Sequence, residues 1–298
     1  MATNQVVLIT GSSTGFGRLF TETLARKGYT VFATMRDPGG RNAKNAAELD
    51  ALAKKESLAI HVLDLDVTKD DSVEKAVRAA ADKTGRIDVV INNAGFPVVG
   101  LAETITVDQA QRQFDTNFFG CVRVNRAALP YMRKQKSGLL LHISSGAGRL
   151  VFPTFGMYCA SKFALEAFSE AYNYELAGQG IQSISIQPGA YQTAIFGRIE
   201  VGDDKSRTET YGGANQILGK ISDALTQSAG NAQEVADAVL RIIETPAAQR
   251  KLHYRVSPQD IGVDAINDLC EQTQQRVLEA FNLVEETKFV QKGVAATN

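Results

Sequence analysis

The stretch VVLITGSSTGFG at residues 6–17 decides the fold. Its first five residues form an apolar run typical of a buried strand, and apolar side chains recur at helical spacing from Gly15 onwards. Between strand and helix lie Gly11, Gly15 and Gly17, at a Gly-x3-Gly-x-Gly spacing. Such a turn exposes backbone N–H groups at the positive end of a helix dipole, which suits phosphate. A glycine turn without a ligand is the alternative, but the position on the first strand-to-helix turn favours phosphate binding.

Outward from this turn, short apolar runs alternate with longer segments of helical period. The predicted strands lie at 6–10, 30–33, 58–63, 87–91, 139–143, 181–186 and 252–256. The predicted helices lie at 15–27, 42–56, 69–83, 107–136, 156–177, 231–243 and 261–283. Strands buried on both faces read as continuous apolar runs, and their alternation with helices implies right-handed crossovers and a parallel sheet. The pattern predicts a doubly wound, Rossmann-like α/β fold.

We expect one domain over residues 1–298, because no linker or repeat interrupts the pattern. Residues 191–230 are rich in glycine and charge, which indicates an irregular, mobile lid. Residues 260–298 form a C-terminal extension whose amphipathic helix should close the fold with one apolar face. That face carries Ile266, Leu269, Cys270, Val277 and Phe281.

The charge balance excludes several classes of protein. Of the 298 residues, 44% are apolar. The 32 Lys and Arg residues are balanced by 33 Asp and Glu residues. A protein that binds nucleic acid needs an excess of basic residues, which this chain lacks. The longest apolar runs are far below the ~18 residues of a membrane span, and no basic segment typical of a secretory signal precedes the first strand. Three cysteines and three histidines show no metal spacing. We therefore expect a cytoplasmic protein with reduced thiols, no metal, no membrane span and no nucleic-acid partner.

Three further motifs follow predicted strands. Leu65-Asp66-Val67 follows the third, Asn92-Asn93-Ala94-Gly95 the fourth, and Pro188-Gly189, with Thr193 four residues on, the sixth. Together with residues 10–17, these motifs resemble the short-chain dehydrogenase/reductase family. The resemblance covers residues 5–195 clearly and the rest in outline.

The resemblance implies a dinucleotide site. In such a site Asp66 touches the adenine, and Thr193 holds the nicotinamide carboxamide. The full set of residues implied to bind the cofactor is Gly11, Ser13, Thr14, Gly15, Phe16, Gly17, Arg36, Asp66, Val67, Asn93, Ala94, Gly95, Tyr158, Lys162, Pro188, Gly189 and Thr193.

The end of the second strand bears on the choice between NADP and NAD. Relatives that prefer NAD carry an acidic residue there, and this chain has Met35 followed by Arg36. A guanidinium pairs well with a 2′-phosphate, so the sequence favours NADP. Thr14 stands where many NADP-binding relatives have a basic residue, and Asp37 adjoins Arg36, so NAD stays as the alternative.

Tyr158 and Lys162 lie four residues apart near the start of a predicted helix and share one face. A phenol has a pKa near ~10, too high for proton exchange at neutral pH, and a neighbouring ammonium should lower it. Alone, the pair is typical of an exposed helix surface. However, Ser145 stands thirteen residues before Tyr158 and Asn117 twenty-eight before Ser145, as in the family's Asn–Ser–Tyr–Lys tetrad.

The resemblance assigns a role to each member of this tetrad. Tyr158 exchanges a proton with the substrate oxygen, and Ser145 donates a hydrogen bond to that oxygen. Lys162 tunes Tyr158 and holds the ribose, while Asn117 supports a water-linked proton relay through Lys162. Apolar residues near the expected mouth of the site suggest a hydrophobic substrate: Val98, Val99, Val151, Phe152, Phe155 and Phe196.

The sequence thus predicts an oxidoreductase of the ketone reductase or alcohol dehydrogenase type. It would move hydride between NADP(H) and a small carbonyl or secondary alcohol, as a homodimer or homotetramer formed through the helices at 107–136 and 156–177. The alternative is a protein of another functional class, which has the same fold and binds NADP(H) as a sensor but does not catalyse a reaction. Enoyl reductases space the tyrosine and lysine more widely, and epimerases of the longer family branch have another glycine spacing.

Overall fold

Every residue of β1 (Val6–Ile9) is buried, and its successive side chains enter two different cores. Val7 and Ile9 face one core, while Val6 and Leu8 face the other. A strand covered on both sides cannot alternate between apolar and polar residues, which explains the unbroken apolar run. The computed structural model describes residues 5–191, 193, 199–227 and 229–290.

β1 is the third strand of a seven-stranded sheet in which every paired strand runs parallel to its neighbour. The strand order is β3-β2-β1-β4-β6-β7-β9. The other six strands are β2 (Thr30–Met35), β3 (Ile60–Asp64), β4 (Val89–Asn92), β6 (Gly138–Ile143), β7 (Ile181–Pro188) and β9 (His253–Val256). The predicted doubly wound parallel sheet is therefore confirmed.

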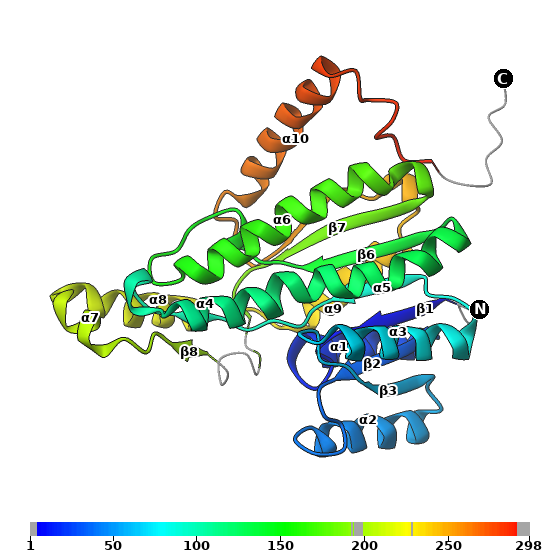
Figure 1. Ribbon diagram of the computed structural model, residues 1–298, viewed down its shortest axis with the longest axis horizontal. Coiled ribbons are helices and arrows are strands. Elements are labelled where there is room, and N and C mark those ends of the chain that lie inside the picture. The colour runs from blue at the N-terminus through cyan, green and yellow to red at the C-terminus, as the bar shows by residue number, and fades with distance from the viewer. Residues whose placement is uncertain (1–4, 192, 194–198, 228, 291–298) are drawn as a thin grey trace.

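Helices cover both faces of this sheet (Figure 1). The first core lies under α1 (Gly15–Arg26), α2 (Ala43–Glu56) and α9 (Gln233–Glu244). The second lies under α3 (Asp70–Thr84), α5 (Gly120–Gln135) and α6 (Gly156–Leu176). The chain moves outward from β1 to β3 and then returns to β4 on the other side of β1. A crevice at this reversal, beyond the carboxyl ends of β1 and β4, is where such sheets bind ligands.

The helix predicted at 107–136 is interrupted. It consists of α4 (Val107–Phe114), a π-helical segment (Asp115–Phe119) and α5. In the π-helical segment the N–H of Gly120 donates to the carbonyl of Asp115, five residues earlier. The wider turn rotates the side chains that follow Asn117 relative to those before it. A single wide turn is too short to change the hydrophobic periodicity of the sequence, so the pattern predicted one continuous helix.

The prediction of an irregular segment at 191–230 is wrong for much of its length. β8 (Glu200–Val201) pairs in parallel with β5 (Val98–Val99), and α7 (Lys205–Thr210) and α8 (Gln216–Gln227) follow. These helices extend to one side of the sheet in Figure 1. Neither helix has a buried residue, and although Ile217, Ile221 and Leu225 of α8 recur at helical spacing, the glycines and charges around them predicted a loop.

The C-terminal helix forms, as α10 (Val263–Ala280), but the expected packing of its apolar face is wrong. Leu269 is 64% exposed and Phe281 70% exposed, whereas Val263, Asn267 and Leu278 are the buried residues. In Figure 1, α10 rises away from the body of the fold, which agrees with the exposure of most of its residues.

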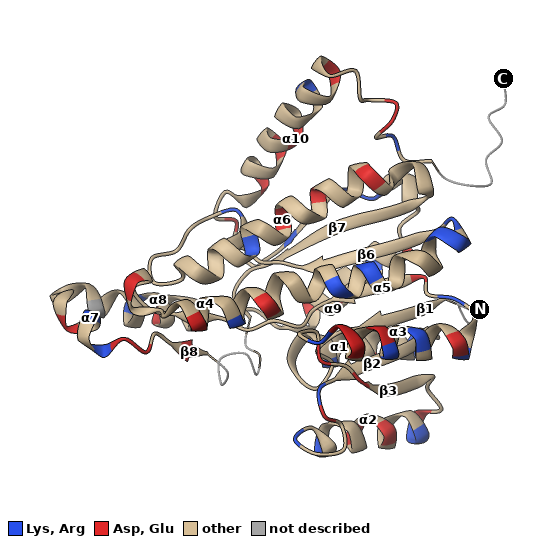
Figure 2. Ribbon diagram, viewed as in Figure 1, with Lys and Arg blue, Asp and Glu red and all other residues tan. Residues whose placement is uncertain are grey.

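Charged residues of both signs are mixed along α2 and α3, which cover opposite faces of the sheet (Figure 2). None of the helices within the described residues has the length and apolar character needed to cross a membrane.

Candidate active site

The backbone between β1 and α1 presents a cradle of N–H groups. Thr14, which precedes the helix, makes no side-chain capping bond, and no acidic residue stands in the first turn. Gly11 and Gly15 have φ of 70° and 58°, in the left-handed region that favours glycine. The first N–H groups of α1 therefore meet no side-chain cap and can bind an anion at the carboxyl edge of the sheet.

Thr10 connects this turn to the end of β4. Its Oγ1 accepts hydrogen bonds from the N–H groups of Asn93 at 2.9 Å and Ala94 at 3.0 Å. The Nδ2 of Asn93 donates to the carbonyl of Thr10 at 2.8 Å in return. Two predicted cofactor motifs thus lie side by side, with exposed Gly95 next in the chain. Sequence reasoning quoted Thr10 in the motif but gave it no role.

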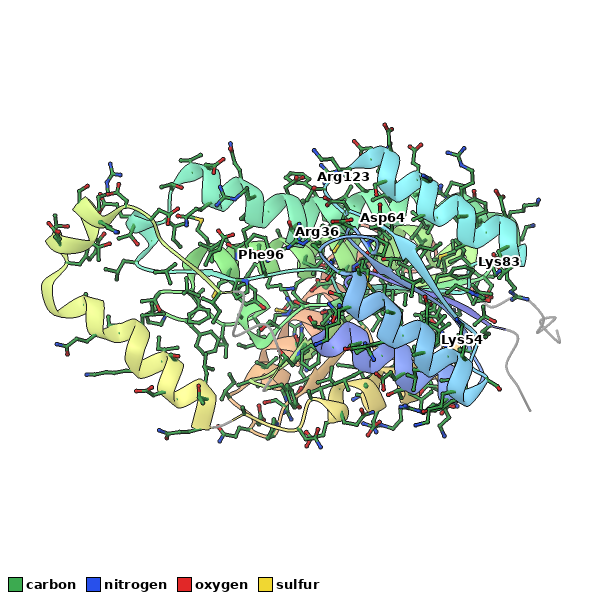
Figure 3. The ribbon with its side chains drawn as sticks, turned by 90° about the horizontal axis from the view of Figure 1, so that it is seen from below. Arg36, Lys54, Asp64, Lys83, Phe96 and Arg123 are labelled. Carbon is green, nitrogen blue, oxygen red and sulfur yellow. The ribbon has the colours of Figure 1, made fainter. Side chains whose placement is uncertain are left out.

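The outer end of the crevice carries Arg36, exposed directly after β2 (Figure 3). Within the described part of the chain, its side chain makes no hydrogen bond or ion pair. Asp37 is held away from it, because its N–H donates to Asp64 at 2.9 Å and its carboxylate accepts from the N–H of Arg41 at 2.9 Å. The guanidinium of Arg36 is therefore available to an anion.

Asp66 and Val67 lie beside this end, after β3. One oxygen of Asp66 accepts from both the N–H and the hydroxyl of Thr68, at 3.0 and 2.8 Å. Val67 is buried against Gly120, where an added β-carbon would lie 2.9 Å from it. This packing fixes the segment, and the second carboxylate oxygen of Asp66 has no hydrogen-bond partner among the described residues.

Ser145, Tyr158 and Lys162 converge at the carboxyl ends of β6 and the start of α6. The Oγ of Ser145 accepts from the N–H of Ala147 at 3.1 Å, and the Ser145 side chain also hydrogen-bonds Tyr158. The Nζ of Lys162 lies 5.7 Å from the centroid of the Tyr158 ring and donates to the carbonyl of Ile143 at 2.8 Å. Three of the four predicted catalytic residues are thus assembled.

The pKa values correct one expectation. Burial raises the pKa of Tyr158 to about 12, although the hydrogen bond from Ser145 works in the opposite direction. Burial also lowers the pKa of Lys162 to about 8, against the attraction of Cys121 and Glu166. The amine bonds a carbonyl rather than the phenol oxygen, so desolvation outweighs the predicted coupling and Tyr158 retains its proton at neutral pH.

The buried amine predicts a pH-dependent stability. Because the pKa of Lys162 falls from 10.5 to about 8, the unfolded chain binds more protons between these values, and stability should rise with pH across that window. Relative to Lys162→Met, the wild type should gain on the order of 3 kcal/mol in free energy of unfolding between pH 8 and 10.5. Urea denaturation at several pH values measures this, with Lys220→Met on the exposed side of α8 as the control. A constant difference between wild type and Lys162→Met would contradict it.

Asn117 lies in the π-helical segment and is 1% exposed. Its Oδ1 accepts from the N–H of Phe96 at 3.0 Å, and its Nδ2 donates to the carbonyl of Phe96 at 3.0 Å. A β-carbon on Gly95 would lie 3.1 Å from this Oδ1 and 3.9 Å from the Nζ of Lys162. The side chain thus holds the loop after β4 beside Lys162; the water-linked relay stays a prediction.

At the inner end, Gly189 follows β7, and its N–H donates to the carbonyl of Val256 at 2.8 Å. Thr193 returns to the glycine turn, since a β-carbon on Gly15 would lie 3.7 Å from its Cβ. Of these predicted residues, Thr193 thus lies against the turn, whereas Gly189 packs on Ser257. Of the predicted mouth, Val98 and Val99 are buried, Phe152 and Phe155 half-buried and Val151 69% exposed, while Phe196 lies outside the described residues.

The sequence profile of the family described as short chain dehydrogenase matches residues 5–204. The chain belongs to the short-chain dehydrogenase family. It is 33% identical over 239 residues to a 3-ketodihydrosphingosine reductase of Bacteroides thetaiotaomicron, covering 80% of this chain and 83% of that one. It is 34% identical over 292 residues to retinol dehydrogenase 8 of Homo sapiens, covering 93% and 91%.

Solved structures agree with this assignment. A short-chain dehydrogenase from Streptomyces avermitilis is 29% identical, with a TM-score of 0.73 over 94% of this chain and 98% of that one. A serine dehydrogenase solved with NADP+ has a TM-score of 0.71 at 24% identity, over 86% and 96%, and supports the fold alone.

Members of this short-chain dehydrogenase family are oxidoreductases that use NAD(P), and the crevice fits such a dinucleotide. The uncapped N–H groups of α1 suit its pyrophosphate, and a β-carbon on Gly17 would lie 2.4 Å from the carbonyl of Gly11, so no side chain can fill the turn. The glycine turn, the loop at 93–95 and Thr193 lie close together at the carboxyl edge of the sheet.

Sequence reasoning missed a buried group of charges behind this site. His253, one of the three histidines without metal spacing, lies within hydrogen-bond distance of Arg149, Glu170 and Glu271. The available signal was the spacing of Glu166 and Glu170, which follow Lys162 at intervals of four on one helix face.

Proposed function

We propose that the protein is an NADP(H)-dependent reductase or dehydrogenase of a hydrophobic carbonyl compound or its secondary alcohol. The observation that carries this proposal is the convergence of Ser145, Tyr158 and Lys162 beside the glycine turn. A hydroxyl, a phenol and a buried amine at one end of a dinucleotide crevice are suited to hold a carbonyl oxygen and exchange its proton.

In the reductive direction Tyr158 acts as the general acid. A pKa of about 12 means that the phenol is protonated at neutral pH and holds a proton for the carbonyl oxygen. Ser145 donates a hydrogen bond to the same oxygen as negative charge develops, and also stabilises the phenolate that remains. The ammonium of Lys162 lies close enough to the ring to favour that phenolate.

Bound NADP(H) would supply or accept the hydride. Residues 11–17 would bind its pyrophosphate, Asp66 and Val67 would border its adenine, and Thr193 would hold its carboxamide. Asn117, through its two bonds to Phe96, keeps the loop after β4 in contact with the nicotinamide end. In the oxidative direction the phenolate of Tyr158 takes the hydroxyl proton, and the hydrogen bond from Ser145 opposes the rise in pKa that burial causes.

The substrate proposed is one with a long apolar chain. Val151 is 69% exposed, and Val201, which is 55% exposed, pairs with buried Val99 on the neighbouring strand. Exposed apolar side chains around a site mark an apolar ligand. The names of two relatives, a 3-ketodihydrosphingosine reductase and a retinol dehydrogenase, refer to compounds with long apolar chains, which supports the same class.

A series of methyl ketones tests the substrate class. Each methylene buried on binding contributes about 0.8 kcal/mol, so kcat/KM should rise roughly fourfold per carbon from about four carbons until the site is filled. NADPH oxidation, followed by its absorbance, measures the series, with a ketose sugar as the polar control. A flat series, or faster turnover of the sugar, would contradict the proposal. Binding of NADPH with no turnover of any carbonyl would instead support a cofactor sensor.

Arg36 tests the cofactor preference. Arg36→Ala removes the guanidinium proposed to pair with the 2′-phosphate, and charged hydrogen bonds of this kind contribute about 1.5–3 kcal/mol. We expect kcat/KM for NADPH to fall roughly 10- to 100-fold and kcat/KM for NADH to stay unchanged, because NADH lacks that phosphate. Arg78→Ala, on the exposed side of α3, is the matched control. An equal loss with both cofactors would remove Arg36 from this role.

A further inference from the structure

Five charged side chains lie together behind the proposed active site, and we call them the Arg149 cluster. They come from four parts of the chain: the loop after β6, helix α6, strand β9 and helix α10. The members are Arg149, Glu166, Glu170, His253 and Glu271. The side chain of Glu166 is 1% exposed, that of His253 2% and that of Arg149 11%. Charges this deeply buried must be paired.

Arg149 is the cation at the centre of the cluster. Its Nη2 is paired with Glu170, lies 2.7 Å from the Nε2 of His253 and 3.5 Å from Glu166. Its Nε donates to Asn267 of α10 at 2.9 Å. Glu166, Glu170 and His253 have ligand atoms within 4.8 Å of one another, a grouping that could hold a divalent ion. Here the guanidinium lies among them and neutralises the carboxylates.

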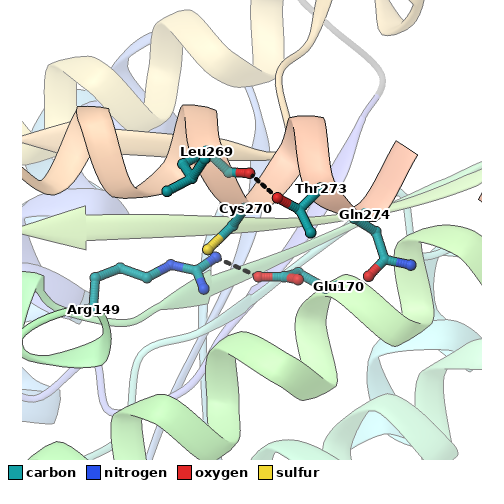
Figure 4. Close-up of a pocket in the computed structure, with 6 residues that line it drawn as sticks. All are labelled: Arg149, Glu170, Leu269, Cys270, Thr273 and Gln274. Carbon is teal, nitrogen blue, oxygen red and sulfur yellow. Dashed lines mark hydrogen bonds and ion pairs between the residues drawn. The ribbon is translucent and has the colours of Figure 1, made fainter. Parts of the chain in front are cut away.

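One side of the cluster opens onto a cleft of about 390 Å³ between α6 and α10 (Figure 4). The ion pair between Arg149 and Glu170 lies at its wall, opposite the α10 residues Leu269, Cys270, Thr273 and Gln274. The paired end of Arg149 is thus next to solvent, whereas Glu166 lies on the inner side, toward the sheet.

The inner side of the cluster adjoins the residues of the site. Ser145 is the N-cap residue and Arg149 the C-cap residue of the 3-10 turn Gly146–Gly148. The N–H of Ala147 donates to the Oγ of Ser145 at 3.1 Å, and that of Gly148 to its carbonyl at 2.8 Å. A β-carbon on Gly148 would lie 2.9 Å from the Cγ of Glu166, so the turn rests directly against this glutamate.

Glu166 continues the same helix face as Tyr158 and Lys162, one turn beyond the lysine. Its two oxygens also accept from Ser185 at 2.6 Å and from Gln187 at 3.0 Å, both on β7. Gln187 directly precedes the Pro188-Gly189 segment of the crevice. A single buried carboxylate thus joins the turn that carries Ser145, the helix that carries Tyr158 and the strand that leads to the nicotinamide end.

We propose that Arg149 is a positioning residue of the active site: by pairing with Glu166 and Glu170 on α6, it fixes the turn that carries Ser145 against the helix that carries Tyr158. The role of Ser145 in turnover rests on the proposed function, whereas the fixing of the turn does not. Without the guanidinium, Glu166 and Glu170 lose the cation between them and the turn loses its tie to α6. Ser145 then no longer meets Tyr158 and the substrate oxygen together.

A double-mutant cycle on kcat tests the role in turnover. Arg149→Lys keeps the charge but lacks the planar fork that reaches Asn267, Glu170 and His253 at once. We expect kcat to fall roughly 10- to 100-fold in Arg149→Lys and about 100- to 1000-fold in Ser145→Ala, since a hydrogen-bond donor to a developing oxyanion contributes that much. If Arg149 acts through Ser145, the double variant should be no slower than Ser145→Ala alone. A loss equal to the product of the two single losses would overturn the proposal.

Amide hydrogen exchange tests the fixing of the turn without any turnover. The peptide that spans residues 144–150 should exchange roughly tenfold faster in Arg149→Lys than in the wild type, because freed turn amides open locally. The exchange rates of peptides from β1 should not change. Glu170→Gln keeps the shape of the side chain that pairs with Arg149 and should raise exchange at 144–150 by a smaller factor. This second variant tests the proposal if Arg149→Lys does not fold. Unchanged exchange at 144–150 in both variants would overturn the proposal, even if no substrate were found.

The matched control is Arg250→Lys. Arg250 is also partly buried, and it donates to the carbonyls of Ile242 and Ile243 and to Gln182 at the amino end of β7. This variant should lose stability but leave both kcat and exchange at 144–150 unchanged. An equal effect of Arg250→Lys on both readouts would show that general destabilisation is the cause and would overturn the assignment.

Discussion

Tyr158→Phe should lower kcat for a long-chain ketone by about 1000-fold or more and leave the dissociation constant of NADPH within about threefold of the wild type. The ring of Tyr158 packs edge-on against Phe155 at 6.3 Å, and a phenyl ring keeps that contact. What the variant loses is the proton donor to the carbonyl oxygen. Steady-state NADPH oxidation measures the first quantity and NADPH fluorescence the second.

Tyr174→Phe is the matched control for this prediction. Tyr174 lies on the same helix, and burial raises its pKa to about 12 as well, but it is far along α6 from Ser145. It should retain wild-type kcat, since the effect depends on the position of the phenol and not on its burial. Substantial turnover by Tyr158→Phe would remove Tyr158 from the role of general acid.

Gly17→Ala should have the second largest effect, on cofactor binding. The added β-carbon would lie 2.4 Å from the carbonyl of Gly11 and 2.6 Å from the Nδ2 of Asn93, so backbone must move. Overpacking of this kind costs about 1–3 kcal/mol in stability. Because the displaced atoms form the turn itself, we expect the NADPH dissociation constant to rise about 100-fold or more. Calorimetric titration with NADPH measures the change in affinity.

Gly219→Ala is the control for the glycine turn. No heavy atom lies within 4 Å of a β-carbon at Gly219, which sits in the middle of helix α8. Alanine there should stabilise the helix by about 0.5–1 kcal/mol and leave NADPH affinity unchanged. Tight NADPH binding by Gly17→Ala would show that the turn is not the pyrophosphate site.

The local signals in the sequence predicted the sheet and the crevice well. Apolar runs such as 6–10 mark strands buried on both faces, and glycines such as Gly11 mark a conformation that other residues adopt at a cost. Both signals depend on neighbours in the sequence alone. The convergence of Ser145, Tyr158 and Lys162 was predicted from the resemblance to the family, whose tetrad has the same spacing.

Other features depend on contacts between distant segments and could not be predicted. Arg149, His253 and Glu271 meet only because β9 and α10 fold back onto α6. The exposed face of α10 has the same apolar spacing as a packed helix, so Leu269 and Phe281 were placed in a core that does not cover them. The raised pKa of Tyr158 depends on how far the ring is removed from water, which spacing to Lys162 does not reveal.

Deuterium transfer tests most directly the claim that Tyr158 exchanges a proton with a carbonyl oxygen beside bound NADP(H). The enzyme is mixed with NADPH deuterated at C4 and with a long-chain methyl ketone, and the product alcohol is analysed by mass spectrometry. The wild type should yield alcohol with one deuterium on the carbinol carbon, and Tyr158→Phe, saturated with the same cofactor, should yield almost none in the same time. Labelled alcohol formed by Tyr158→Phe at the wild-type rate would contradict the claim.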